Sequence, residues 1–246
     1  MFYIDSHCHL DLLKNIYQNP SIEDDLSIKS ISVTNAPFLF QPNQKLFAQS
    51  KNIRVALGMH PELIPEYHQQ LNLFEESIIL TKYIGEIGLD GSSNHNLSYL
   101  MQKKIFENIL SIISSTDNKV LTVHSRNAST ETISLLYKFL KNTNCKIILH
   151  WYSGNLPELK EAIKYNFLFS INHKMTSTKK GYEIIEHIPL KNILTETDAP
   201  FTFDKKINTR LKSLETTIEG LSVQKKTTKE EMKSIIFDNF KELLTS

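Results

Sequence analysis

The chain has 246 residues, of which 40% are hydrophobic and 22% are charged, which is typical of an ordinary globular protein. Lys and Arg number 28 against 27 Asp and Glu, so the net charge of +1 excludes a global electrostatic attraction to nucleic acid or to a membrane surface. No apolar run approaches the ~20 residues that cross a bilayer, and two cysteines, Cys8 and Cys145, cannot build a disulfide framework, so we expect a cytoplasmic protein.

Short β-branched runs alternate with longer amphipathic segments along the chain. The strand candidates are FYIDSH (2–7), IKSISVTN (28–35), IRVALG (53–58), KYIGEIG (82–88), KVLTVHS (119–125), CKIILH (145–150), FLFSIN (167–172) and NILTET (192–197). Apolar spacing predicts helices over 97–115, 130–141, 156–164, 179–187 and 228–244, with Asn155 capping the third. This alternation predicts an α/β fold, a TIM-type (β/α)8 barrel in which residues 1–246 form a single domain; a doubly wound open sheet is the alternative.

The first strand candidate runs into the sequence DSHCH, residues 5–9. Strand alternation places His7 and His9 on one face, and two imidazoles on one face can bind a single metal ion. Asp5 falls on the same face, where it can orient one of these ligands. Two ordinary histidines are the alternative, and the rest of the chain must decide between them.

Metal-competent side chains recur where the other strand candidates end. The set is His7, His9, His60, Glu86, His124, His150 and Asp198. In a (β/α) barrel the strand ends share one rim, so we expect a single site there. Imidazole nitrogens and carboxylates suit zinc, manganese, iron or magnesium, and a carboxylate can bridge two cations. Six of these residues shared between two ions would leave open positions for water and substrate, which is typical of a catalytic site.

Six separated motifs carry a family resemblance between Met1 and Phe201. They are DSHCHLD, ALGMHP, GEIGLD, VHSRNA, HWYSG and ETDAPF. In their order and spacing the chain resembles the TatD family of metal-dependent deoxyribonucleases, within the amidohydrolase superfamily of metal-binding barrels. The resemblance implies a hydrolase that cleaves phosphodiester bonds in DNA, often from the 3′ end, with two divalent ions (Mg, Mn, Zn or Fe) as cofactors.

The resemblance also implies roles for individual residues. It implies that the metal ligands are His7, His9, Glu86, His124, His150 and Asp198, with Glu86 as the bridge and with Glu86 and Asp198 among the catalytic residues. His60 and Arg126 match catalytic and substrate-binding positions near the scissile phosphate, where a proton donor and a guanidinium would stabilise growing charge. A capping role before Pro61 is the alternative for His60.

Other segments depart from the family pattern or lack an assigned role. Gly91-Ser92-Ser93 replaces the usual aromatic residue, and His173 and Lys174 are candidates to meet substrate. Basic residues that could hold phosphates are Lys174, Lys179, Lys180, Lys205, Lys206, Arg210 and Lys212. Trp151, Tyr152 and Phe201 are candidates to stack a base. A solvated face and core packing are the respective alternatives.

DNA is thus the expected substrate, a monomer is the default state, and no membrane partner is expected. Two other functions remain open. The same metals could hydrolyse an amide or ester, for which an enclosed apolar pocket would be the discriminating feature. Alternatively, the barrel could be a non-catalytic subunit with protein partners in a nucleic-acid-processing or defence complex.

Overall fold

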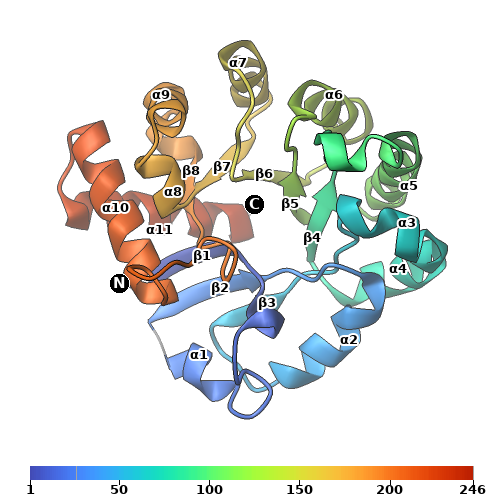
Figure 1. The fold of residues 1–246 in the computed structure, drawn as a ribbon, viewed down its shortest axis with the longest axis horizontal. Helices are drawn as coiled ribbons and strands as arrows, with labels where there is room; N and C mark the ends of the chain where they lie inside the picture. The colour runs from blue at the N-terminus through green and yellow to red at the C-terminus, as the bar shows by residue number, and fades with distance from the viewer. Residues whose placement is uncertain (26, 246) are drawn as a thin grey trace.

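Eight parallel strands form a ring at the centre of the structure, a computed structural model that describes residues 1–25 and 27–245 (Figure 1). The strands are β1 (Tyr3–Cys8), β2 (Ile28–Ser32), β3 (Ile53–Val55), β4 (Tyr83–Gly88), β5 (Val120–His124), β6 (Lys146–His150), β7 (Leu168–Ile171) and β8 (Ile193–Thr195). Each lies within one of the predicted strand segments or within one residue of it. The predicted (β/α)8 barrel is confirmed.

The ring closes at two seams between hydrogen-bonded ladders. Within the described residues, β1, β2 and β3 form one ladder and β4 to β8 form the other. Leu57, just after β3, forms a parallel bridge with Ile84 of β4. At the other seam, the backbone N–H of Asp198 donates to the carbonyl of His7 at 2.9 Å. These contacts join the first strand to the last, so the open-sheet alternative is wrong.

Helices surround the ring (Figure 1). They are α1 (Ser21–Asp25), α2 (Pro37–Leu46), α3 (Ile64–Tyr67), α4 (Leu71–Ser77), α5 (Tyr99–Thr116), α6 (Ser129–Leu140), α7 (Leu156–Lys164), α8 (His173–Thr176), α9 (Lys179–His187), α10 (Arg210–Lys225) and α11 (Lys229–Thr245). Short 3-10 helices are η1 (Leu10–Leu12), η2 (Pro61–Leu63), η3 (His68–Gln70), η4 (Ile78–Leu80), η5 (Ser93–His95) and η6 (Leu190–Asn192). The five predicted helices, α5, α6, α7, α9 and α11, are confirmed to within two residues at each end, whereas the other α-helices, of which α10 is the longest, were not predicted.

Helix α7 shows how local sequence sets an element boundary. The Asn155 side chain accepts a hydrogen bond from the Glu158 N–H at 3.0 Å, and the Glu158 carboxylate accepts one from the Asn155 N–H at 2.9 Å. This reciprocal capping satisfies two N–H groups that have no partner within a helix. Pro157 stands in the first turn, where its missing N–H costs nothing. The predicted cap is confirmed.

The hydrophobic core lies on both faces of the strands. Strand residues such as Leu121, Leu149 and Phe169 are fully buried and belong to one continuous apolar cluster. Helices cover the outer face and side chains fill the interior, so the strands read as nearly continuous apolar runs. The polar residues are therefore left for the strand ends. Among the described residues no helix has both the length and the apolar character that crossing a bilayer requires.

Candidate metal centre

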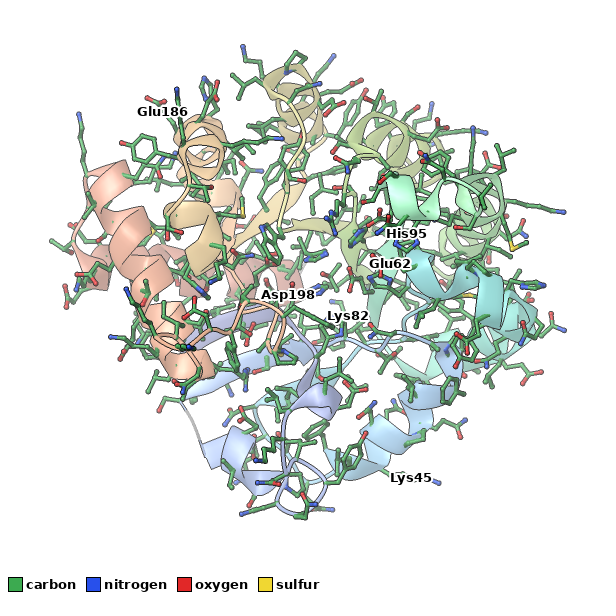
Figure 2. All side chains as sticks on the ribbon, viewed as in Figure 1. Lys45, Glu62, Lys82, His95, Glu186 and Asp198 are labelled. Carbon is green, nitrogen blue, oxygen red and sulfur yellow. The ribbon has the colours of Figure 1, made fainter. Side chains whose placement is uncertain are left out.

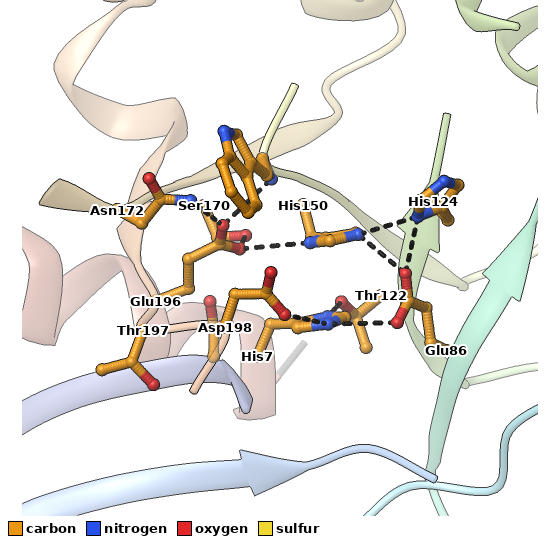
Figure 3. Close-up of polar contacts among 12 residues, drawn as sticks. His7, Glu86, Thr122, His124, His150, Ser170, Asn172, Glu196, Thr197 and Asp198 are labelled. Carbon is orange, nitrogen blue, oxygen red and sulfur yellow. Dashed lines mark hydrogen bonds and ion pairs between the residues drawn. The ribbon is translucent and has the colours of Figure 1, made fainter. Parts of the chain in front are cut away.

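The strand ends bring the predicted metal-competent side chains to one mouth of the barrel. The residues that line the cavity of about 520 Å³ there include His9, His60, Glu86, His124, His150 and Asp198. His7 lies beneath them, with its side chain fully buried. Figure 3 shows the side chains of His7, His124 and His150 gathered around Glu86. The sequence prediction that these side chains share one rim is confirmed.

Four donor atoms surround a first position suited to a metal ion. His7 Nε2 and His9 Nε2 lie 3.4 Å and 3.3 Å from Glu86 Oε2, and 3.6 Å and 3.5 Å from Asp198 Oδ1. Ligands at about 2.0–2.2 Å in a tetrahedron lie about 3.3–3.6 Å apart, so these spacings match. His7 Nε2 is buried without a hydrogen bond, while its Nδ1 pairs with Thr122 Oγ1 at 2.6 Å. The four side chains therefore fit one divalent ion.

The second carboxylate oxygen of Glu86 faces a separate group of imidazoles. Glu86 Oε1 lies 2.8 Å from both His124 Nδ1 and His150 Nε2, and 3.2 Å from His60 Nε2. The nitrogens of His124 and His150 are 3.3 Å apart and both point at this oxygen. The two oxygens of Glu86 therefore face different groups of donors, Oε2 toward His7 and His9 and Oε1 toward His60, His124 and His150.

Burial and close charges perturb the pKa values in this centre. Burial opposes ionisation of Glu86, but electrostatic interactions with the imidazoles of His60, His150 and His7 hold its pKa well below the usual range. Burial and repulsion from His150 lower the pKa of His7 to about 4. Burial also disfavours charge on His9, yet hydrogen bonds to Asp198 and Glu86 outweigh it and raise its pKa to about 10. The Glu86 carboxylate is thus ionised and attracts cations.

Two buried carboxylates that sequence reasoning missed lie next to the histidine rings. Asp90 Oδ2 lies 2.7 Å from His124 Nε2, on the side of the ring opposite Glu86, and a contact of this kind orients an imidazole that binds a metal. Glu196 Oε2 lies 3.8 Å from His150 Nδ1, which has no hydrogen-bond partner among the described residues, and Glu196 Oε1 accepts the Trp151 N–H at 3.1 Å. Asp90 stands in the motif GEIGLD and Glu196 in the motif ETDAPF, so their positions inside these motifs could have identified both residues from the sequence.

Asp5 does not orient a histidine, so that prediction is wrong. Its carboxylate accepts hydrogen bonds from the Thr197 N–H and hydroxyl, each at 2.8 Å, and from Arg210 Nε at 2.8 Å. The pairing register of β1 with β2 shifts between Asp5 and Cys8, so simple alternation does not carry through the strand. Asp5 instead fixes the backbone next to Asp198, which has a left-handed φ of 48°.

His60 and Arg126 both reach the cavity. The His60 Nδ1 accepts the Glu62 N–H at 3.2 Å, so the capping role exists alongside the contact of Nε2 with Glu86. Arg126 is exposed, lines the same cavity, and has a guanidinium without a partner among the described residues. Lys174 is not among the cavity-lining residues, and its Nζ pairs with Asp204 Oδ2 at 2.5 Å.

The basic segment after β8 includes one residue that cannot contact phosphate. Arg210 is only 2% exposed and pairs with Asp5 at 2.8 Å and with Glu23 at 2.5 Å. Its inclusion among phosphate-binding residues is wrong, because buried carboxylates already hold the guanidinium. The side chains that remain exposed in the predicted clusters are Lys179, Lys180, Lys205, Lys206 and Lys212. His173 is also buried, with its Nδ1 2.8 Å from Ser213 Oγ, so it cannot meet substrate.

The three aromatic candidates separate into two classes. Trp151 and Phe201 line the cavity, and the Phe201 ring is 60% exposed with its edge-on neighbour His9 at 5.0 Å. Tyr152 is buried, and its hydroxyl donates to the carbonyl of Asn155 at 3.0 Å. The stacking prediction is therefore wrong for Tyr152, which belongs to the core, and stays a prediction for the other two.

Comparisons with known proteins give the relatives of this chain. The family model described as TatD related DNase matches residues 4–245. An uncharacterized metal-dependent hydrolase of Buchnera aphidicola subsp. Baizongia pistaciae is 30% identical over 222 residues, 82% of this chain and 79% of that protein. Deoxyribonuclease Tat-D of Schizosaccharomyces pombe is 32% identical over 117 residues, 48% of this chain and 37% of that protein. The human 3′-5′ RNA nuclease TATDN2 is 28% identical over 228 residues, 83% of this chain and 29% of that protein.

A solved structure supports the fold independently. The crystal structure of YJJV, a TatD homolog from Escherichia coli K12, superposes with a TM-score of 0.83 at 19% sequence identity, covering 98% of this chain and 97% of that one. At 19% sequence identity, this structural similarity supports the barrel fold and nothing beyond it. The family model, in contrast, spans nearly the whole sequence and includes each motif quoted above. The chain therefore belongs to the TatD family of metal-dependent hydrolases.

Proposed function

We propose that this protein is a divalent-metal-dependent phosphodiesterase that removes nucleotides from an end of DNA. The observation that carries the proposal is the exposed guanidinium of Arg126, which has no partner among the described residues and lines the same cavity as Glu86 and Asp198. A planar fork of N–H donors matches the oxygens of a phosphodiester. The scissile group of an amide or ester, in contrast, carries no negative charge before the reaction.

The donor groups around Glu86 would hold two ions. His7, His9 and Asp198 would share the first with one Glu86 oxygen, and His124 and His150 would share the second with the other. When bound, divalent ions supply Lewis acidity and lower the pKa of water enough to make it a nucleophile near neutral pH. Asp90, which is hydrogen-bonded to His124, would keep that imidazole ring aimed at the second ion.

His60 is positioned to donate a hydrogen bond into the cavity. Its Nδ1 accepts the Glu62 N–H, so the proton of the neutral ring resides on Nε2, the nitrogen that faces Glu86 and the cavity. This N–H can donate a hydrogen bond to the leaving oxygen, on which negative charge grows as the phosphodiester bond breaks. Arg126 would stabilise the negative charge on the other phosphate oxygens. His60 would thus act on the leaving oxygen and Arg126 on the other phosphate oxygens of the same transition state.

The size of the cavity supports a terminal nucleotide as its occupant. A volume of about 520 Å³ lies in the range of sites for single small molecules, which is too small for a duplex. Trp151 and Phe201 supply aromatic faces at its wall for one base. The S. pombe relative is named a deoxyribonuclease and the human relative an RNA nuclease, so both polymers belong in the test.

The test is cleavage by metal-free protein resupplied with Mg²⁺, Mn²⁺ or Zn²⁺, with EDTA as the blank. Linear and circular single strands, duplex DNA and RNA are compared. We expect linear single strands to shorten and circles to resist, and Glu86→Gln and Asp198→Asn to lose activity by at least about 100-fold. Glu66→Gln, an exposed carboxylate on α3, is the matched control. Absence of cleavage with every metal, together with turnover of an amide or ester panel, would replace the proposal with the other hydrolase class.

A further inference from the structure

A separate group of metal-competent side chains lies on the loops after β3 and β4. Each of Glu62, Asp90 and His95 offers one ligand atom, and these atoms all lie within 4.8 Å of one another. Figure 2 shows Glu62 and His95 next to each other beside the barrel mouth. We propose that these three residues bind an additional divalent cation, distinct from the ions that the Glu86 centre would hold.

The distances match those of a coordination shell. His95 Nε2 lies 3.2 Å from Glu62 Oε1, close to the separation of about 3.3 Å between two ligands of one tetrahedral ion. Asp90 accepts one hydrogen bond at each carboxylate oxygen, from the Ser92 N–H at 2.8 Å and from His124 at 2.7 Å. A carboxylate has about four lone-pair sites, so Asp90 keeps the capacity to bind an ion.

The backbone places the three ligands before any ion arrives. The Glu62 N–H donates to His60 Nδ1 at 3.2 Å, and the Asp90 N–H donates to the Gln102 side chain at 2.9 Å. The His95 N–H closes its own turn on the Ser92 carbonyl at 2.9 Å. Holding ligands in place lowers the ordering cost of binding.

Access and charge also favour an ion at this position. The side chains of Glu62 and His95 are 38% and 24% exposed, so an ion can enter from solvent, whereas Asp90 is fully buried. Among the described residues no Lys or Arg pairs with Asp90, and His124 is its one ion-pair partner. An ion pair between Glu62 and His95 alone would contribute little to the stability of the fold, because both side chains are partly exposed. A cation compensates both carboxylates at once.

The ligand types identify the class of ion. One imidazole nitrogen and two carboxylate oxygens suit Zn²⁺ or Mn²⁺, and three protein ligands leave an open coordination position toward the cavity that Glu62 lines. An ion here would join the loop of Glu62 to the loop of His95. Asp90 would then connect this ion to His124, so loading of the new site would stiffen the second group of imidazoles at Glu86.

The test counts ions and requires no substrate. Metal-free wild-type protein and the Glu62→Gln/His95→Gln variant are titrated with Zn²⁺, and bound metal is measured by mass spectrometry after dialysis. Glu66→Gln/His68→Gln makes the same chemical changes at exposed positions nearby and is the control. We expect the variant to bind one equivalent less than wild type and than the control.

A second variant separates this site from the Glu86 centre. Glu86→Gln removes the proposed bridge, so it should lose the ions there and keep the one that Glu62 and His95 hold. Equal stoichiometry and Zn²⁺ affinity within twofold for wild type and Glu62→Gln/His95→Gln would overturn the proposal, provided that thermal unfolding shows both proteins folded. Failure of the nuclease assay would leave this result unaffected, because ion counting does not depend on the reaction.

Discussion

Removal of the buried guanidinium of Arg210 should cost the protein about 3 kcal/mol of unfolding free energy. Breaking a buried ion pair by deleting one partner typically costs about 3–5 kcal/mol, because the other charge is left uncompensated. We expect the lower end for Arg210→Met, since Asp5 would keep its two hydrogen bonds from Thr197. Glu23 is the less buried partner, with 15% of its side chain exposed, and can regain water.

The measurement is urea unfolding of metal-free protein followed by circular dichroism at pH 7. Asp5→Asn/Arg210→Met should be more stable than the sum of the two single changes predicts, by about 1–3 kcal/mol, because the unpaired carboxylate is gone. Lys205→Met removes an exposed cation from the same segment and should lie within about 0.5 kcal/mol of wild type. A loss below about 1 kcal/mol for Arg210→Met would refute this account of the buried ion pair.

Three further changes test other parts of the molecule. Burial raises the pKa of Asp24, but hydrogen bonds from Ser50 and two loop N–H groups outweigh burial and lower that pKa. The stability that Asp24→Asn removes should therefore be present above the unfolded pKa of about 3.9 and be lost as the pH falls through the lower folded pKa. Urea unfolding of both proteins between pH 2 and 7 measures this difference, and a difference that stays constant with pH contradicts the prediction. A methyl group on Gly91 would lie 2.4 Å from the carbonyl oxygen of Asn127, so Gly91→Ala should displace the loop that carries Arg126 and raise KM for nucleic acid, and an unchanged KM would contradict this. The third variant replaces four exposed lysines with Gln: Lys179, Lys180, Lys205 and Lys206. If these lysines hold phosphates, the variant should have a higher KM at nearly constant kcat, and its binding should depend less on salt. Wild-type affinity across the salt titration would instead identify these lysines as a solvated face.

The sequence predicts those parts of the fold in which burial directly determines the order of apolar and polar residues along the chain. Strands buried on both faces read as apolar runs, and each ends where a polar residue faces the barrel mouth, so Glu86 and Asp198 could be placed together from their positions alone. Helix α10 escaped prediction because its buried face consists largely of polar side chains. That face includes Arg210, Ser213, Leu214, Thr217, Ile218, Leu221 and Ser222. The buried residues of α10 recur at helical spacing, but because many of them are polar, no apolar stripe is visible in the sequence.

Contacts between distant polar residues were beyond the sequence for a different reason. Asp5 and Arg210 are separated by 205 positions, and nothing in either neighbourhood identifies the other as its partner. The same holds for Asp90 and His124, whose pairing depends on how two adjacent loops turn after their strands. Strand alternation misassigned Asp5 because the β1 register shifts just after it. Partner choice is a property of three-dimensional packing, which a pattern along one chain does not contain.

The seam between β1 and β8 sets when the metal centre can form during biosynthesis. His7 and His9 leave the ribosome among the first residues, but Asp198, whose N–H bonds to the His7 carbonyl, follows only after most of the chain has been made. Pairing of segments so far apart carries a large loop-closure cost and is slow to form. One edge of the first strand can pair early with β2, but its other edge must wait until the last strand arrives. A nascent chain stopped before β8 would lack Asp198 beside His7 and His9, so an ion that needs all three side chains would be captured only at the final stage of folding.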